Sequence, residues 1–286
     1  MEVIRTVEGL RKQTKEWKKD NVSIGFVPTM GYLHEGHESL ISESLKKCDK
    51  TVVSIFVNPM QFGEGEDLAA YPRDFEKDER LLKKLGVDIL FYPDKEEMYP
   101  NGFVSYIDMD SPMPAVLCGK TRPIHFKGVC TVVCKLLNMV MPDKAFFGEK
   151  DAQQLAIIRR MVKDFNMDVE IVGCPIIREV DGLAKSSRNS YLSAQERKAA
   201  LIISKAMRLG QCLASDGEKN ATIIVAKMKE LIQTEPLAKV DYVEAVDKHT
   251  LEQVDKCGEE TLFAAAVYIG KTRLLDNFSG IHKRTI

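Results

Sequence analysis

Two histidines, His34 and His37, stand three residues apart where an apolar segment gives way to a helical pattern. Residues 22–27 are apolar and mostly β-branched or aromatic, and Pro28 follows them, which predicts a buried strand. Residues 37–45 carry apolar side chains near helical spacing. A helix that begins at the carboxyl end of a strand points unpaired N–H groups and a partial positive charge into the crevice beyond the sheet. The pair could therefore bind a phosphate.

Two other interpretations of the pair stay open at this point. Zinc proteases place their histidines four residues apart with a glutamate between them, whereas the spacing here is three and Gly36 interrupts it. A zinc site would also need further ligands. Alternatively, the two side chains are ordinary, partly exposed histidines. The rest of the chain has to distinguish these interpretations.

The composition limits the class of protein. The 286 residues suit one large or two modest domains, and the net charge of −1 gives no general electrostatic footprint for nucleic acid, so we expect no nucleic-acid partner. Without a signal region or an apolar run of about 20 residues, we expect no membrane association. The seven scattered cysteines contain no Cys-x-x-Cys pair, which favours a cytoplasmic protein without a disulfide framework.

Alternating strand and helix patterns predict an α/β fold with a Rossmann-like, doubly wound parallel sheet and right-handed crossovers. The predicted strands are residues 22–27, 51–57, 87–92, 144–147 and 169–172, of which the first two are expected to be buried.

The pattern changes after Pro175. A capping box at residues 193–196 predicts a helix that continues to about Leu213, and residues 220–233 predict another. Two later segments, 240–246 and 262–269, read as antiparallel strands. We therefore expect two domains, a Rossmann-like domain over 1–175 and a smaller α+β domain over 176–286.

Three polar clusters follow predicted strands and should converge at one edge of the sheet. After the histidine pair come Asn58 with Gln61, and then the turn at residues 148–151 with Gln154. The glycine and lysine of that turn suit a phosphate, and the two glutamine amides suit the hydroxyls or carboxylate of a small substrate. Each cluster alone could equally be a solvated surface.

Two further segments could bind anions. The loop at residues 185–189 carries two cations and two hydroxyls, and His125 stands at a predicted helix start. Either could also be an ordinary solvated feature. The Rossmann dinucleotide and P-loop glycine fingerprints are both absent.

Together these segments resemble the pantothenate synthetase (pantoate–β-alanine ligase) family over nearly the whole chain. This family belongs to the nucleotidylyltransferase-like proteins related to class I aminoacyl-tRNA synthetases; the histidine pair resembles their HIGH signature, and the Ser-Ser-Arg loop occupies the place of their KMSKS loop. The segments that carry the resemblance are Pro28-Thr29-Met30-Gly31 with His34-Glu35-Gly36-His37, Phe56-Val57-Asn58-Pro59-Met60-Gln61-Phe62, Leu117-Cys118-Gly119, His125-Phe126-Lys127-Gly128-Val129, Phe147-Gly148-Glu149-Lys150-Asp151 with Gln153-Gln154-Leu155, and Ser186-Ser187-Arg188-Asn189.

The resemblance implies an AMP-forming ligase that works in two steps. Pantoate attacks the α-phosphate of Mg-ATP to give pantoyl adenylate and diphosphate, and β-alanine then displaces AMP to give pantothenate. It further implies ATP as a substrate together with Mg²⁺, the small-molecule partners pantoate and β-alanine, and a homodimer.

The resemblance also implies roles for individual residues. Gln61 would bind pantoate and β-alanine, with Gln154, Asn58 and His125 as further pantoate contacts. The implied catalytic residues are His37, His34, Lys150 and Arg188, and the protein ligands of the metal are not identified. The implied ATP-binding residues are Pro28, Thr29, Met30, Gly31, Tyr32, Leu33, His34, Glu35, Gly36, His37, Gly148, Glu149, Lys150, Asp151, Ile177, Lys185, Ser186, Ser187 and Arg188.

One position departs from the family pattern. Many members carry a methionine directly before Ser-Ser-Arg, where this chain has Lys185. A methionine contact to the adenine therefore cannot be carried over, although backbone contacts to the nucleotide could persist.

Overall fold

The structure is a computed structural model that describes residues 1–280. These residues form two compact units. One contains Met1–Asp110, Arg122–Glu149 and Ile157–Pro175; the other contains Ser111–Thr121, Lys150–Ala156 and the chain from Ile176 on. The predicted domain boundary at residues 175 and 176 stays a prediction, and residues 281–286 of the predicted second domain lie outside the described residues.

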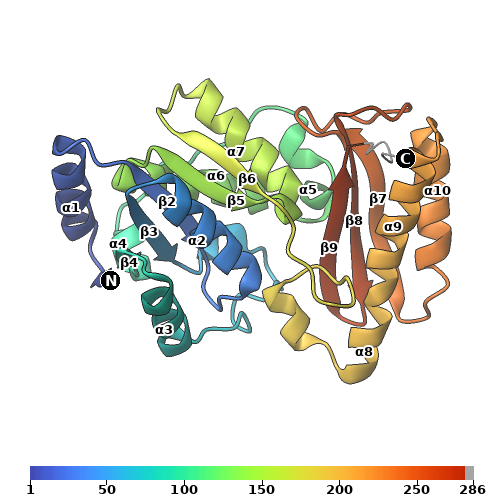
Figure 1. Ribbon diagram of the computed structural model, residues 1–286, viewed down its shortest axis with the longest axis horizontal. Helices are drawn as coiled ribbons and strands as arrows, with labels where there is room; N and C mark the ends of the chain where they lie inside the picture. The colour runs from blue at the N-terminus through green and yellow to red at the C-terminus, as the bar shows by residue number, and fades with distance from the viewer. Residues whose placement is uncertain (281–286) are drawn as a thin grey trace. The chain divides into compact units, whose positions relative to one another are not determined.

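The first unit is built on a six-stranded sheet in which every pairing is parallel (Figure 1). This confirms the predicted fold class, and all five predicted strands are present. In spatial order the strands are β1 (Glu2–Ile4), β4 (Ile89–Phe91), β3 (Lys50–Ile55), β2 (Ile24–Thr29), β5 (Lys144–Gly148) and β6 (Glu170–Cys174).

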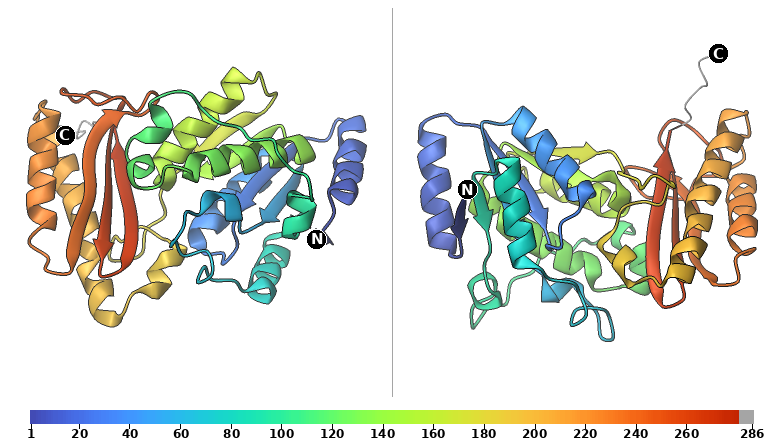
Figure 2. Two further views of the ribbon diagram at one scale, coloured as in Figure 1. Left: turned by 180° about the vertical axis from the view of Figure 1, so that it is seen from behind. Right: turned by 60° about the horizontal axis from the view of Figure 1, so that its bottom comes forward.

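Helices cover both faces of this sheet. Leu40 of α2 and Leu82 of α3 belong to a buried cluster with Val27 and Val53 of the central strands. Because side chains alternate along a strand, the neighbouring Phe26 points to the opposite face. There α6 contacts β2 (Figure 2), and most of its apolar side chains are buried. The helices of the first unit are α1 (Val7–Lys19), α2 (Glu35–Lys47), α3 (Phe75–Leu85), α4 (Lys95–Met98), α6 (His125–Val140) and α7 (Ala152–Asp164) from Ile157 on; α5 (Cys118–Thr121) and the start of α7 belong to the second unit.

The strand order places the topological switch point of the sheet between β2 and β5. From β2 the chain moves outward through β3 and β4, and it later returns to the other side of β2 as β5. Ligands of open α/β sheets bind beyond the carboxyl ends of the strands at such a point. The carboxyl ends here are Thr29 of β2, which leads into the histidine segment, and Gly148 of β5.

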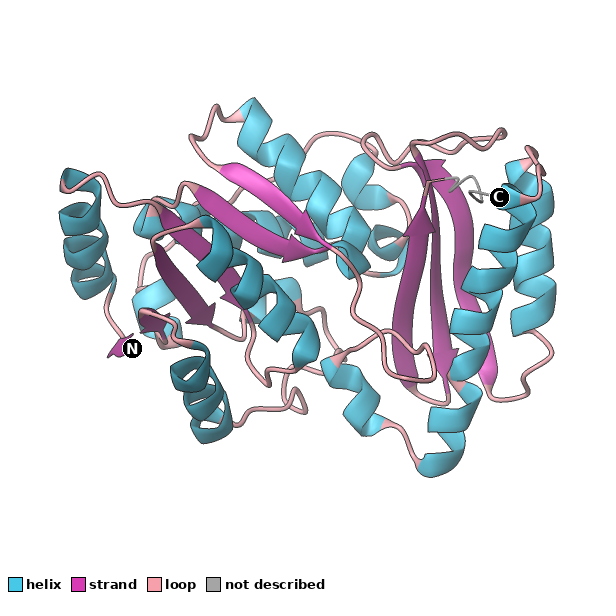
Figure 3. Cartoon of the chain, in the orientation of Figure 1, coloured by secondary structure: helices cyan, strands magenta, loops and turns pink. Residues whose placement is uncertain are grey.

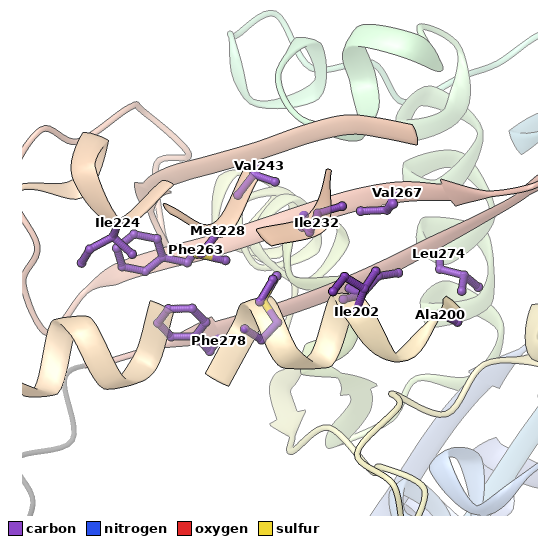
Figure 4. Close-up of a cluster of buried hydrophobic side chains, with 14 of the residues drawn as sticks. Ala200, Ile202, Ile224, Met228, Ile232, Val243, Phe263, Val267, Leu274 and Phe278 are labelled. Atoms are coloured by element: carbon purple, nitrogen blue, oxygen red, sulfur yellow. The ribbon is translucent and has the colours of Figure 1, made fainter. Parts of the chain in front are cut away.

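The second unit contains a separate antiparallel sheet of β7 (Ala238–Asp247), β8 (Thr261–Ile269) and β9 (Thr272–Ser279) (Figure 3). Helices α9 (Leu201–Ser215) and α10 (Ala221–Ile232) pack against it. In the core between them, the rings of Phe263 and Phe278 stack with their centroids 4.8 Å apart (Figure 4).

Two details of this unit differ from the sequence prediction. The helix predicted from the capping box to Leu213 is broken at Ala200 into α8 (Ala194–Ala199) and α9, where Ile203 N–H bonds to the Ala200 carbonyl and tightens the turn. Strand β9 was not predicted, because Asp276 and Asn277 interrupt its apolar pattern. Both are buried, and their polar groups find partners within the unit.

Candidate active site

The two histidines cap the helix that follows β2. His34 is the N-cap of α2, and its Nδ1 accepts a hydrogen bond from the Gly36 N–H at 3.1 Å. In return, Nδ1 of His37 accepts the His34 N–H at 3.3 Å. The ring centroids lie 4.1 Å apart. The two imidazoles therefore cap the helix, a role that serine or aspartate side chains commonly have. They accept hydrogen bonds from backbone N–H groups that have no partner within the helix.

This arrangement fixes which imidazole nitrogen carries the proton. An Nδ1 atom that accepts a hydrogen bond cannot itself be protonated, so the proton of each neutral ring is on Nε2. Both His34 and His37 can then donate through Nε2–H without carrying a positive charge. Such donors at a helix N-terminus suit the oxygen atoms of a phosphate.

Asn58, a member of the second polar cluster, has hydrogen-bond partners for both polar atoms of its side chain. It is 1% exposed, and its Oδ1 accepts the Tyr99 hydroxyl at 2.8 Å. Its Nδ2 donates to Oε1 of Gln61 at 3.2 Å and to the Gly128 carbonyl at 3.1 Å. Gln61 in turn donates through Nε2 to Sδ of Met30 at 3.1 Å. Asn58 thus orients the Gln61 amide toward the end of β2.

His125 supports the same segment from α6. Its Nδ1 lies 2.8 Å from the Gln61 carbonyl oxygen, and Nη1 of Arg122 lies 3.1 Å from its Nε2. Because an arginine can only donate and a carbonyl can only accept, His125 is neutral with its proton on Nδ1. Arg122 also binds Glu66 through Nε at 2.9 Å. Although burial opposes the effect, this contact holds the pKa of Glu66 below its usual value.

The predicted turn after β5 begins at Gly148, where a Cβ atom would meet no neighbour within 4 Å. The next three residues form a short 3₁₀ helix, Glu149–Asp151, that runs into α7. Lys150 Nζ lies 3.5 Å from Oδ1 of Asp151, and its side chain is 18% exposed. The open space beside Gly148 permits a ligand to approach the backbone closely.

The Ser-Ser-Arg loop belongs to the second unit. The Ile177 carbonyl accepts the Lys185 N–H at 2.9 Å, which joins the start and end of the segment leading to the loop. Ser186 caps a 3₁₀ helix over Ser187–Tyr191 by accepting the Arg188 N–H at 3.3 Å. Two of the predicted ATP-binding residues, Ile177 and Lys185, are therefore hydrogen-bonded to each other.

Gln154 lies on α7 and is partly exposed. Its neighbour Gln153 is buried, where Oε1 accepts the Cys118 N–H at 2.9 Å and Nε2 donates to the Met113 and Val116 carbonyls. Gln153 therefore has a structural role, whereas Gln154 is accessible to a ligand.

Within the first unit, the structure brings Met30, Asn58, Gln61 and His125 into one hydrogen-bonded chain beside the end of β2. Sequence reasoning missed two members of this network, Arg122 and Tyr99. Arg122 stands three residues before His125, the spacing of one helical turn, which was the available signal. Nothing in the sequence around Tyr99 indicated its contact with Asn58.

The parallel sheet, with polar groups gathered at its switch point, defines an α/β protein of the Rossmann-like class. A family model described as pantoate-beta-alanine ligase matches residues 2–279, and the chain belongs to that family. It is 56% identical over 281 residues to the pantothenate synthetase of Ruminiclostridium cellulolyticum, with 98% of this chain and 99% of that protein covered. It is 55% identical over 279 residues to that of Clostridium acetobutylicum, with the same coverage.

Solved structures are similar over the same length. The pantothenate synthetase of Thermus thermophilus matches with a TM-score of 0.93 and 41% identity, covering 98% of this chain and 99% of that one. The pantoate-beta-alanine ligase of Francisella tularensis, described as complexed with beta-gamma ATP and beta-alanine, matches with a TM-score of 0.81 and 35% identity, covering 98% and 97%.

Proposed function

We propose that the protein joins pantoate to β-alanine at the expense of ATP, giving pantothenate, AMP and diphosphate. The observation that carries the proposal is the match to pantoate–β-alanine ligases from residue 2 to residue 279. The helix cap formed by His34 and His37 supports it, because it supplies two Nε2–H donors at the switch point of the sheet.

In the first step, a carboxylate oxygen of pantoate attacks the α-phosphorus of ATP, and the bond to the bridging oxygen of diphosphate breaks. In the second step, the β-alanine amine attacks the carbonyl carbon of pantoyl adenylate, loses a proton, and expels AMP. Catalysis of such a transfer depends on positioning and on stabilisation of the developing charge.

His34 and His37 would donate to phosphate oxygens as negative charge builds on them. The remaining ATP contacts would come from the Met30 segment, the turn from Gly148 to Asp151, Ile177, and the loop from Lys185 to Arg188. Lys150 and Arg188 would supply positive charge. The donors at Gly148 are backbone groups, consistent with the open space beside it.

Gln61 would hold the pantoate hydroxyl or carboxylate and contact β-alanine, with Gln154 as a second pantoate ligand. Asn58 and His125 would act on pantoate through Gln61, because their polar atoms bind its side chain and its carbonyl.

Mg²⁺ would enter with the phosphates of ATP, as is common for this cation. Within residues 1–280, no cluster of three or more His, Cys, Asp or Glu side chains is arranged to hold a metal. Nor does any helix in that range have the length and apolar character needed to cross a membrane. We further propose a cytoplasmic homodimer, and sedimentation would test its oligomeric state.

The decisive assay measures AMP formation with ATP, pantoate and β-alanine, and then with each omitted in turn. We expect full activity only with all three substrates, and pantoate-dependent exchange between ATP and diphosphate without β-alanine. AMP formation that is undiminished without β-alanine would contradict the ligase assignment.

A further inference from the structure

The turn that joins β2 to the histidine cap has an unusual backbone. Gly31 has φ of +82° and Tyr32 has φ of +53°, the left-handed region that a side chain such as tyrosine rarely adopts. A Cβ atom at Gly31 would lie 2.9 Å from Cγ2 of Ile55, so glycine is required there. A strained turn of this kind persists only when its surroundings hold it.

One carboxylate binds two consecutive backbone groups of this turn, while the Thr29 hydroxyl accepts the Gly31 N–H at 3.1 Å. Asp78 on α3 accepts the Tyr32 N–H through Oδ2 at 2.7 Å and the Leu33 N–H through Oδ1 at 2.7 Å. Both oxygens are thus committed to consecutive N–H groups directly before His34. Asp78 is 1% exposed. Its burial raises the pKa of the carboxyl group, while the two backbone hydrogen bonds favour the charged form.

Packing holds this turn only in part: Leu33 is 3% exposed within a hydrophobic cluster, but the side of the turn at Gly31 and Tyr32 borders a cavity. A cavity of about 190 Å³ lies against it, with Gly31, Tyr32 and Asp78 among the lining residues and Phe75 and Tyr92 also contributing to its wall. The turn can therefore relax into open space if the carboxylate is removed, because the dense packing that fixes most loops is missing on this side.

We propose that Asp78 is a positioning residue for ATP binding, which holds the 30–33 turn so that His34 and His37 keep their capped orientation. The proposal rests on the proposed function only in taking ATP as the ligand of the two histidines. Asp78 itself touches no substrate. It acts through the backbone that carries the histidine pair.

The test compares Asp78→Asn with Asp78→Glu. Asparagine keeps the size of the side chain but offers one acceptor oxygen, so that its NH₂ group faces a backbone donor. We expect Asp78→Asn to weaken ATP binding about 10-fold or more, with the KM values of pantoate and β-alanine changed less than about threefold. Asp78→Glu keeps both acceptor oxygens and has the cavity for its extra methylene, so we expect it to restore ATP affinity to within about threefold of wild type.

Asp74→Ala is the matched control. Asp74 lines the same cavity and caps α3 by accepting the Lys77 N–H at 3.0 Å, but it makes no bond to the turn. Its removal should lower the melting temperature and leave ATP affinity unchanged. Equal loss of ATP affinity in Asp74→Ala and Asp78→Asn would overturn the proposal, as would wild-type affinity in Asp78→Asn or failure of Asp78→Glu to recover.

The measurement is calorimetric titration with a non-hydrolysable ATP analogue, followed by steady-state kinetics. Analogue binding does not require pantoate chemistry. A wild-type protein that binds the analogue but forms no AMP would contradict the proposed function, while the comparison of the Asp78 variants would still decide whether this residue positions the nucleotide site.

Discussion

At Gly128, α6 packs directly against the backbone of the segment that carries Gln61. A Cβ atom at this position would lie 2.3 Å from the Met60 carbonyl oxygen and 2.6 Å from the Gln61 nitrogen. Both are backbone atoms, so no side-chain rotation relieves the overlap. Gly128→Ala therefore forces the helix and the 59–61 turn apart by roughly 0.7 Å to reach a 3.0 Å contact.

Two opposing effects determine how much Gly128→Ala changes the free energy of unfolding. Alanine is favoured over glycine in a helix by about 1 kcal/mol, whereas overpacking costs about 1–3 kcal/mol, toward the upper end when backbone must move. We expect a net loss of about 1–2 kcal/mol in the free energy of unfolding. Displacing Gln61 should also raise the KM of pantoate about 10-fold. The substitution should also disturb the hydrogen bond that Asn58 donates to the Gly128 carbonyl.

Thermal unfolding and steady-state kinetics with varied pantoate test this prediction. Gly258→Ala is the control, because a Cβ atom there meets nothing within 4 Å and the change should leave both quantities as in wild type. If Gly128→Ala keeps the wild-type pantoate KM while its stability falls, the placement of Gln61 does not govern pantoate binding.

Three further outcomes are expected. Asp276, whose side chain is 2% exposed, pairs with Arg178 at 2.7 Å, and this pairing raises the pKa of Arg178. Arg178→Ala leaves the buried carboxylate without its ion pair, so denaturant unfolding should show a free energy of unfolding lower by about 3–5 kcal/mol. A decrease below about 1 kcal/mol would contradict this. His37→Gln should lower kcat about 10- to 100-fold, since it removes the neutral Nε2–H donor; a wild-type kcat that falls as the pH rises between about pH 6 and pH 8, with no such fall in the variant, would show that the imidazolium is required. Ser187→Ala and Arg188→Ala should impair pantoate-dependent diphosphate release more than pantoate binding, and normal release by both would remove them from the ATP site.

Much of the first unit could be predicted from the sequence because its strands are short apolar runs that end at proline or glycine. Residues 22–27 and 51–57 are examples, and both are buried strands of the parallel sheet. Strand β9 escaped prediction because its buried Asp276 becomes compatible with a core only through Arg178, nearly a hundred residues away in the sequence. Contacts of that kind leave no local pattern.

The same distinction applies to the candidate site. His34, His37 and Gln61 could be placed at strand ends from the sequence, because nearby prolines and glycines mark where those strands end. The residues that orient them could not, because Tyr99 and Asp78 lie 41 and 45 residues from the groups they bind. Which imidazole nitrogen carries the proton likewise depends on hydrogen-bond geometry that the sequence does not contain.

In the first step of the proposed reaction, the pantoate carboxylate attacks the α-phosphorus of ATP. The most direct measurement uses pantoate labelled with ¹⁸O in both carboxylate oxygens, with ATP and β-alanine, and mass spectrometry of the products. We expect one ¹⁸O atom in AMP and none in diphosphate, because the attacking oxygen stays with the phosphorus when the amine displaces AMP. Unlabelled AMP, or label in inorganic phosphate released together with ADP, would contradict it.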